Sequence, residues 1–539
     1  MGKAGVGLLL LVLVCLGAAD ATRAPVSAQD ARAVSGAAGG AVYRRPLGND
    51  PARLDPARVS DIYGRAVAEQ IFDGLARFDQ TLTIVPALAQ IWKGSRDGLH
   101  WTFTMRKGVK FHHGREVTAD DVVFSLTRIL DPALKSGAAD LLAMVSGARQ
   151  FREGKAKHVA GLVALDRSTV RITLDEAHAP LPAILAVAHA KIVPRDVVER
   201  DRAGFDAHPI GTGPFRFVRW DRGKEIVLAA NPDYFDGAPA LSRLVYRIFP
   251  GERVDEMYAE FRRGQLEDTP VPMGDYRRIV ALPNQLHVKR PMISVRFYGF
   301  NTRTKPLSDR RVRQAILYAI DRESLVTEVT LGRFVVARGI LPPGTLGFNP
   351  RLAGYAYDPR RARQLLAEAG FPGGRGLPPI TMWSSAKTEG VVREQEHLRR
   401  YLDAVGVKAE FKFLTDWPAF SQRLAEGAFP VFLYAWFADV PDPDNFLSKL
   451  FHSRSPRNLF GYANAVVDDL LVRARNEQDL QRRVDLYRRA EQLILDDAPL
   501  IPIFHFTYER LFQPYVRSVE VNGLGDPYIP LRKVWLDRR

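Results

Sequence analysis

Three acidic side chains, Asp439, Asp442 and Asp444, form the chemically most informative cluster in the sequence. Carboxylates grouped in this way can hold a metal cation or the amine of a ligand. Pro441 and Pro443 lie between them, and proline is excluded from helix interiors and central strands. The sequence therefore predicts a turn that presents carboxylates.

The residues before the acids must position this turn. The run 431–435 is apolar and aromatic, which predicts a buried strand. A carboxylate in an apolar cleft needs a partner or becomes protonated, and a ligand ammonium can be that partner. We therefore expect Asp439 to bind a cationic group, the alternative being that it only caps the turn. Asp442 and Asp444 are expected to shape the turn as Asx-type residues do.

The sequence gives little support for a catalytic site or a metal-binding site. The chain has no Gly-x-Ser-x-Gly, His-Glu-x-x-His or phosphate-loop motif. His112 and His113 have no third ligand nearby in sequence, and the three acids lack the glutamate of a calcium loop. We expect neither an enzyme nor a bound cofactor or metal.

The first residues predict export. Lys3 precedes an apolar run, 8–16, that is too short to span a bilayer. Cleavage after Ala28 is preferred over cleavage after Ala21, which gives a signal peptide of residues 1–28. Val14 before the single cysteine, Cys15, does not suit lipid attachment. We expect a soluble extracytoplasmic product without disulfides and without a lipid anchor.

Composition predicts a large globular protein rather than a nucleic-acid-binding one. The chain has 539 residues, of which 46% are hydrophobic and 25% charged, enough for roughly two to four domains. The formal net charge of +15 is high, but the basic residues are scattered, as in the pairs at 310–311 and 360–361. Solvated helix faces explain such pairs better than a nucleic-acid surface.

Local patterns predict mixed α/β structure without a regular βαβ rhythm. Residues 100–105 alternate as a half-buried strand, and 215–228 read as a hairpin. Thr118 and Asp121 have the spacing of a capping box. Further helices are expected behind Ser308, as an N-cap, and between Asp358-Pro359 and Gly370.

Several motifs, in a fixed order, cover nearly the whole mature chain. They are Leu54-Asp55-Pro56, Ile71-Phe72-Asp73-Gly74-Leu75, Trp101-Thr102-Phe103, Thr118-Ala119-Asp120-Asp121, Gly211-Thr212-Gly213-Pro214-Phe215, Asn231-Pro232-Asp233-Tyr234-Phe235, Phe300-Asn301-Thr302 and Trp436-Phe437-Ala438-Asp439. With them the chain resembles the extracytoplasmic solute-binding proteins of family 5, the peptide- and nickel-binding components of ABC importers.

The resemblance implies an α/β fold of the periplasmic-binding-protein type, a two-lobed clamp of class II in its three-domain family 5 variety, with mixed sheets. The first lobe would combine 41–85, 206–290 and 505–539. The extra domain of that lobe would be 86–205, and the second lobe 291–504. A ligand bound between the lobes would favour the closed form.

The resemblance also implies site residues. In peptide-binding relatives the acid matching Asp439 receives the α-amino group, and the residues matching Trp436, Phe437 and Ala438 line the peptide backbone by β-augmentation. Asp50 and Lys387 are weaker candidates, Lys387 for a ligand carboxylate. An arginine that an oligopeptide-binding relative carries before the matching Trp is absent here, where Leu433 and Tyr434 stand.

The favoured function is that of a solute-binding subunit for a peptide or similar amine-bearing solute. Its expected partners are an ABC permease with its ATPase subunits, and it is expected to be monomeric and to bind no nucleic acid. The alternative is a nickel chelate or other non-peptide solute on the same clamp. A more distant alternative is an exported hydrolase.

Overall fold

The predicted strand 431–435 is the centre of the largest sheet. The computed structural model describes residues 40–538 except 203 and 353, so the expected signal peptide lies outside the described residues. The sheet has the order β14-β18-β13-β17-β15-β16. Its strands are β13 (Ser294–Phe300), β14 (Val335–Val336), β15 (Ile380–Ser384), β16 (Ala409–Phe413), β17 (Val431–Phe437) and β18 (Leu500–His505).

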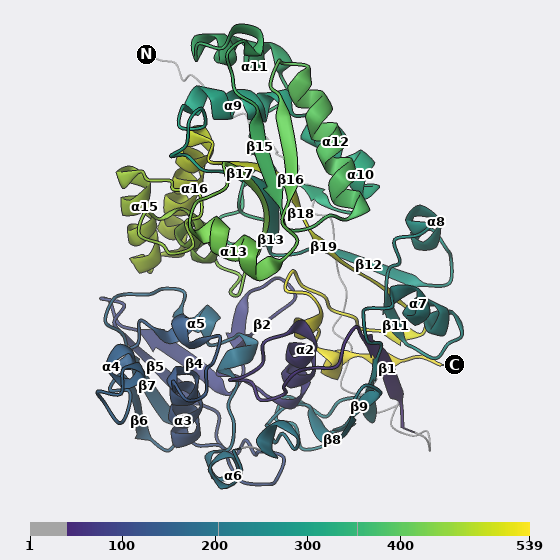
Figure 1. Ribbon diagram of the computed structural model, residues 1–539. Helices are drawn as coiled ribbons and strands as arrows, with labels where there is room; N and C mark the ends of the chain where they lie inside the picture. Colours follow the sequence, from purple (N-terminus) through teal and green to yellow (C-terminus); the bar gives the residue numbers. More distant parts are fainter. Residues whose placement is uncertain (1–39, 203, 353, 539) are drawn as a thin grey trace, which may run out of the picture. The chain divides into compact units, whose positions relative to one another are not determined.

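Helices cover both faces of this sheet, which explains why β17 is apolar on both sides (Figure 1). Val431 and Leu433 pack in the core with the helices of one face, and Phe432 and Tyr434 in the core of the other. The first face carries α9 (Arg310–Ala319), α10 (Arg322–Thr330), α11 (Pro359–Glu368) and α12 (Glu389–Asp403). The second carries α13 (Trp417–Ala425), α14 (Leu447–Phe451), α15 (Ala465–Asn476) and α16 (Leu480–Asp497).

A second sheet has the order β1-β10-β9-β8. Its strands are β1 (Val42–Leu47), β8 (Phe215–Asp221), β9 (Glu225–Ala230) and β10 (Arg243–Ile248). Helix α2 (Ile62–Ile71) buries Val67 and Ile71 in the same core, to which Leu531 and Val534 also belong. Residues from three separate stretches of chain therefore share this core. The predicted hairpin is β8 paired with β9.

A third sheet, of order β4-β5-β7-β6, packs against helix α3 (Ala119–Leu130). It consists of β4 (Ala89–Gly94), β5 (His100–Met105), β6 (Leu162–Asp166) and β7 (Thr169–Thr173). The burial of β5 alternates as its sequence predicts. Thr118 and Asp121 form the predicted capping box at the start of α3.

Two continuous ribbons run between the lobes. Strand β12 (Leu286–Pro291) leads into β13, and β18 leads into β19 (Thr507–Phe512). β12 and β19 pair antiparallel along their whole length, from Leu286↔Phe512 to Pro291↔Thr507, and β11 (Asp268–Pro270) pairs with the other edge of β19. The chain thus passes twice between these sheets, once from β12 to β13 and once from β18 to β19. These two covalent connections are the ones about which two lobes can move.

The remaining elements are short. They are β2 (Ala76–Phe78), β3 (Ile84–Pro86), β20 (Val516–Arg517), β21 (Trp535–Leu536), α4 (Ala148–Arg152), α5 (Leu181–Ile184), α6 (Arg195–Arg200), α7 (Val254–Arg262) and α8 (Tyr276–Val280). In the part of the chain that the structure describes, no helix is long and apolar enough to cross a membrane.

Two helix starts test the local predictions. Asp358 caps α11, Pro359 is its first residue and Gly370 follows it with φ +93°, as predicted. The prediction that Ser308 caps α9 is wrong by one residue. Asp309 is the cap, and its carboxylate accepts a hydrogen bond from the backbone N–H of Arg311 at 2.8 Å.

Candidate functional site

The end of β17 is held to the turn that follows it. The indole Nε1 of Trp436 donates to the backbone oxygen of Asn445 at 2.9 Å, which closes the loop onto the short 3₁₀ turn η5 (Pro443–Asn445). The backbone N–H of Ala438 donates to Ile293 O at 3.0 Å, so β17 stays attached to the β13 side up to the residue before Asp439. We call residues 439–446 the acidic turn.

One edge of β17 is open. On the β13 side every residue from Val431 to Phe437 is paired. On the β15 side pairing is confined to Val431 and Phe432, opposite Met382 and Trp383. From Leu433 onward no described strand pairs with that edge, so backbone groups there are available to another extended chain.

Asp439 lies less deep than the sequence suggested. Its side chain is 48% exposed, and Lys449 Nζ lies 3.5 Å from Oδ2. The expectation of a buried carboxylate is therefore wrong, because the turn leaves the sheet at this residue. A carboxylate can accept about four hydrogen bonds, so most of this capacity is available to a ligand.

The other two acids are structural, as predicted. Asp442 Oδ1 accepts a hydrogen bond from Asp444 N at 2.9 Å, the expected Asx contact. The sequence did not predict that Asp442 would also receive a bidentate pair from Arg483, at 2.7 and 2.9 Å, with both side chains buried. Burial alone would raise the pKa of Asp444, but Arg475, with Nε at 3.0 Å, holds that pKa below its usual value.

Val440 places the acidic turn against the first lobe. It is buried in a core whose other fully buried members all come from residues 57–192, among them Ala57, Val187 and Ala190. Asp439 therefore immediately precedes a residue that packs in a core formed by residues 57–192. No sequence pattern near Val440 predicts this packing, because the other buried residues of the core lie more than two hundred positions earlier in the sequence.

Phe437 and Lys387 lie at the end of the sheet from which the chain leaves β17 toward Asp439, and they differ in chemistry. Phe437 is 48% exposed, and its ring centroid is 5.0 Å from that of Phe506. Lys387 is exposed, follows β15, and has Nζ 5.5 Å from the ring centroid of Phe413. Because β15 and β17 are neighbouring parallel strands, the segments after them leave the same edge of the sheet, where ligands of α/β proteins bind.

Asp50 has a different environment. Its two carboxylate oxygens accept hydrogen bonds from Trp220 Nε1 and Gly223 N, both at 2.8 Å. These bonds close the turn between β8 and β9. Among the described residues, no contact joins Asp50 to residues 436–439.

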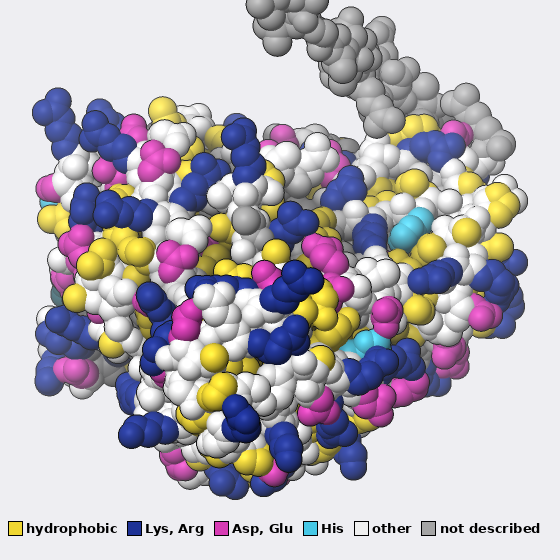
Figure 2. Space-filling model, turned by 90° about the horizontal axis from the view of Figure 1, so that it is seen from above, with side chains coloured by type: hydrophobic (Ala, Val, Ile, Leu, Met, Phe, Trp, Pro, Cys, Tyr) yellow, Lys and Arg dark blue, Asp and Glu magenta, His cyan; other side chains and the backbone are white. Residues whose placement is uncertain are grey.

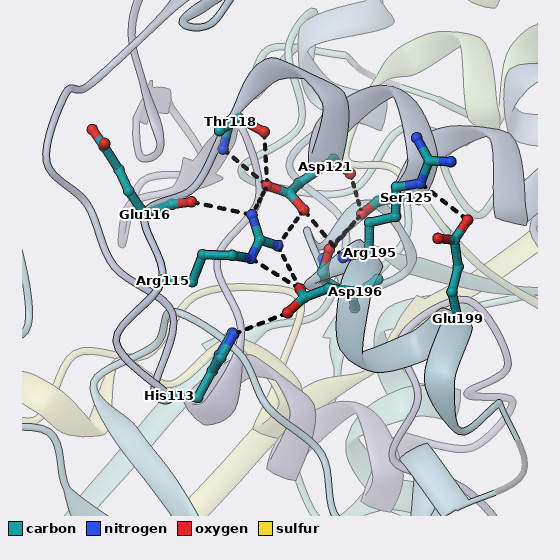
Figure 3. A network of polar contacts seen from close by, with 10 residues as sticks. His113, Arg115, Glu116, Thr118, Asp121, Ser125, Arg195, Asp196 and Glu199 are labelled. Atoms are coloured by element: carbon teal, nitrogen blue, oxygen red, sulfur yellow. Dashed lines mark hydrogen bonds and ion pairs between the residues drawn. The ribbon is translucent and has the colours of Figure 1, made fainter.

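The two neighbouring histidines are occupied by protein contacts. His112 Nε2 donates to Gly213 O at 3.0 Å, and burial lowers the pKa of this histidine to about 4. His113 lies 3.5 Å from Asp196, which also binds Arg115 beside the α3 capping box (Figure 3). The described ranges contain no group of three or more His, Cys, Asp or Glu side chains placed to hold a metal ion.

The surface charge is mixed. Lys and Arg side chains are spread over the face shown in Figure 2, with Asp and Glu among them. Many are paired, for example Arg219 with Asp221 and Arg247 with Glu260. This distribution is that of solvated surfaces rather than a nucleic-acid groove.

A family model matches most of the chain. Residues 83–458 match "Bacterial extracellular solute-binding proteins, family 5 Middle". Among curated proteins, Heme-binding protein A of Haemophilus influenzae is 31% identical over 506 residues and covers 89% of each chain. The Dipeptide-binding protein of Escherichia coli is 30% identical over 467 residues, covering 83% of this chain and 85% of its own.

Solved structures show the same fold. The unliganded open form of the periplasmic murein tripeptide binding protein MppA superposes with a TM-score of 0.83 at 26% identity, covering 93% of this chain and 98% of its own. The periplasmic binding protein DppA from Helicobacter pylori, in complex with the peptide STSA, gives 0.72 at 27% identity, covering 92% and 98%.

Proposed function

The chain belongs to family 5 of the bacterial extracellular solute-binding proteins, and on this premise we propose that it captures peptides with a free amino terminus for an ABC importer. The open edge of β17 carries the proposal. A peptide laid along residues 433–437 would form backbone hydrogen bonds with the open edge of β17. Such bonds do not depend on the side chains of the peptide, so they suit a protein that binds many different peptides.

Asp439 would fix the register of that peptide. It stands directly after the open edge with a largely unused carboxylate, so an α-ammonium group can reach it as the added strand ends. Trp436, Phe437 and Ala438 would line the backbone of the first residues. Lys387, at the same edge of the sheet, would meet a carboxylate of the ligand.

Binding between the lobes would draw them together. A ligand that touches both lobes stabilises the closed form by its differential affinity, and the closed form would be the one that the permease recognises. We propose the lobe boundaries 41–85, 206–290 and 505–539 for the first lobe, 86–205 for its extra domain and 291–504 for the second. Export by residues 1–28 and a monomeric state belong to the same proposal.

Calorimetric titration tests the amine site. We expect short peptides to bind, their N-acetylated forms to bind at least about ten-fold more weakly, and Asp439→Asn to abolish this difference. Asp469→Asn, which removes an exposed acid of α15, is the matched control and should bind as the wild type does. Equal affinity of Asp439→Asn and wild type for free-amine peptides would rule out Asp439 as the amine site.

A planar non-peptide ligand is the second candidate. The half-exposed ring of Phe437, which lies two residues before Asp439 and packs at a tilt against Phe506, offers an apolar wall, and one relative is named for heme binding. Titration with hemin and with nickel-histidine, followed by absorbance, separates this candidate from the first. Saturable binding of either that peptides fail to displace would favour it.

A further inference from the structure

A cavity lies at the β14 edge of the six-stranded sheet, away from the open edge of β17. It has a volume of about 180 Å³ and is lined by β14, β18, α16 and the loop 338–352. In the sheet order β14-β18-β13-β17, the strands β18 and β13 separate β14 from β17. We call this space the β14 cavity.

Most of the wall of the β14 cavity is apolar. Its side chains include Val336, Leu341 and Phe348. Two other lining residues, Arg338 and Pro350, are exposed, so the cavity is reached from the surface. A cavity of about 150 Å³ can hold a benzene ring, so this one has room for a ligand of that size.

Two buried polar side chains also line the cavity. Glu491 of α16 and His505 of β18 are each 2% exposed. Glu491 Oε1 accepts hydrogen bonds from Ile340 N and Leu341 N. His505 Nδ1 donates to Ser294 O at 2.7 Å, so the other ring nitrogen of the neutral imidazole is an acceptor.

Each of the two side chains thus has one acceptor left over, Oε2 of Glu491 and Nε2 of His505. Among the described residues neither atom has a hydrogen-bond partner, and neither is shielded from solvent by protein atoms. In the same part of the chain, no hydrogen bond or ion pair joins Glu491 to His505. Because a buried acceptor without a donor is costly, a ligand or water has to supply one.

Close packing fixes the Glu491 carboxylate. A Cβ at Gly339 would lie 2.7 Å from Glu491 Oε1 and 2.4 Å from Leu352 Cδ2. Any side chain at position 339 would therefore displace one of these two groups. Glycine lets the loop approach closely enough for its N–H groups to hold Oε1, while Oε2 stays unused.

An ionised Glu491 has no ion-pair partner among the described residues. Burial raises the pKa of Glu491 to about 7 and lowers the pKa of His505 to about 4, so at pH 8 the imidazole is neutral and the carboxyl largely ionised. Of the cations around the cavity, Arg338 pairs with Glu323 at 3.2 Å, and Arg488 of α16 donates to two backbone carbonyls of the loop.

We propose that the β14 cavity is a second ligand site, which binds a small primary amine with an apolar body. The ammonium group would donate to Glu491 Oε2 and His505 Nε2, and the apolar part would contact the wall around Phe348. An ammonium has three donors and no acceptor, which matches a pair of acceptors beside apolar side chains. The alternative occupant is water alone.

Benzylamine and benzyl alcohol test the site at pH 8, because they share a ring and differ in the charge of the polar group. In calorimetric titration, wild type should bind benzylamine at least about ten-fold more tightly than benzyl alcohol. Glu491→Gln keeps an acceptor for the two backbone N–H groups but has no charge, so it should lose this preference. His505→Asn keeps a donor for Ser294 O but lacks Nε2, and it should bind benzylamine about five-fold more weakly.

Two variants serve as controls. Glu396→Gln removes an exposed acid of α12 and changes the net charge as Glu491→Gln does. Asp439→Asn removes the acid proposed for the peptide amine. Both should bind benzylamine as wild type does, and thermal unfolding should show every variant folded.

A lower pH gives a second readout. At pH 5.5 Glu491 is largely protonated in the empty protein, whereas His505 stays neutral. Benzylamine then has to displace a proton, so its affinity for wild type should fall by at least about ten-fold between pH 8 and pH 5.5. Glu491→Gln should show no such fall.

Several outcomes would overturn the proposal. Equal affinity of wild type and Glu491→Gln for benzylamine would rule out the carboxylate as the amine site, and an equal loss in Glu396→Gln would leave net charge as the cause. Loss of benzylamine binding in Asp439→Asn would assign the amine to the peptide site. Absence of benzylamine binding to wild type would leave water as the occupant of the β14 cavity.

Discussion

Single buried carboxyl groups set how this protein responds to pH, and Glu491 is the clearest example. It is 2% exposed on α16 and accepts hydrogen bonds from Ile340 N and Leu341 N at 2.8 and 2.9 Å. Burial raises its pKa from 4.5 to about 7, although the two backbone bonds oppose the shift. The folded state therefore binds this proton more tightly than the unfolded state does.

The sign of the effect follows. The stabilising contribution of the protonated Glu491 is fully present below pH 4.5 and is lost as pH rises through about 7. We expect Glu491→Gln, which keeps the acceptor oxygen, to be more stable than wild type by about 1–3 kcal/mol at pH 8. The gap should close as pH falls to 5 in urea unfolding measured at both values. A variant less stable than wild type at pH 8 would contradict this.

At the scale of elements, the acidic turn depends on a buried ion pair. Arg483 of α16 makes two hydrogen bonds to Asp442, and both side chains are buried. Arg483→Met would leave the Asp442 carboxylate without its partner, which typically costs about 3–5 kcal/mol. We expect a clear loss of thermal stability and weaker peptide binding, because Asp439 is the first residue of the acidic turn and lies three residues before Asp442.

The control lies on the neighbouring helix. Arg473 pairs with Asp469 on the exposed face of α15, and such pairs contribute about 0–1 kcal/mol. Arg473→Met should therefore unfold close to the wild-type temperature. Similar losses in the two variants would mean that the turn does not rely on the Asp442–Arg483 pair.

Elements whose signals are local could be predicted from the sequence. The apolar run of β17, the alternation of β5 and the capping box of α3 each lie within a few residues, and all three are present. The cap of α9 was misplaced because Ser308 and Asp309 are both good caps, and the backbone geometry that chooses between them has no sequence signature. Arg475 and Arg483 were missed as partners because only tertiary packing brings them to the turn.

At the scale of the whole molecule, the site depends on contacts that no single element contains. Asp439 could be singled out because strand, rings and prolines surround it in sequence. Its burial could not be predicted, because that depends on how far the turn departs from the sheet. Val440 carried no local signal at all, since a valine between acids is common. Its role comes from the core of residues 57–192 in which it is buried.

We expect the packing of Val440 to affect how readily the two lobes close on a ligand. It follows β17 of the six-stranded sheet but is buried, at 3% exposure, in a core whose other fully buried members come from residues 57–192. Val440→Ala removes part of that packing, at a cost of roughly 1 kcal/mol, without touching a charge. In the closed form that we propose, this packing would join the two lobes, so its loss would lower the population of that form for every ligand alike.

We therefore expect Val440→Ala to weaken binding of the dipeptides Glu-Ala and Gln-Ala by the same factor, about five-fold, in calorimetric titration. An effect confined to one of the two peptides would show that Val440 shapes the ligand pocket itself. A uniform loss would instead identify the packing of Val440 as part of the closing free energy.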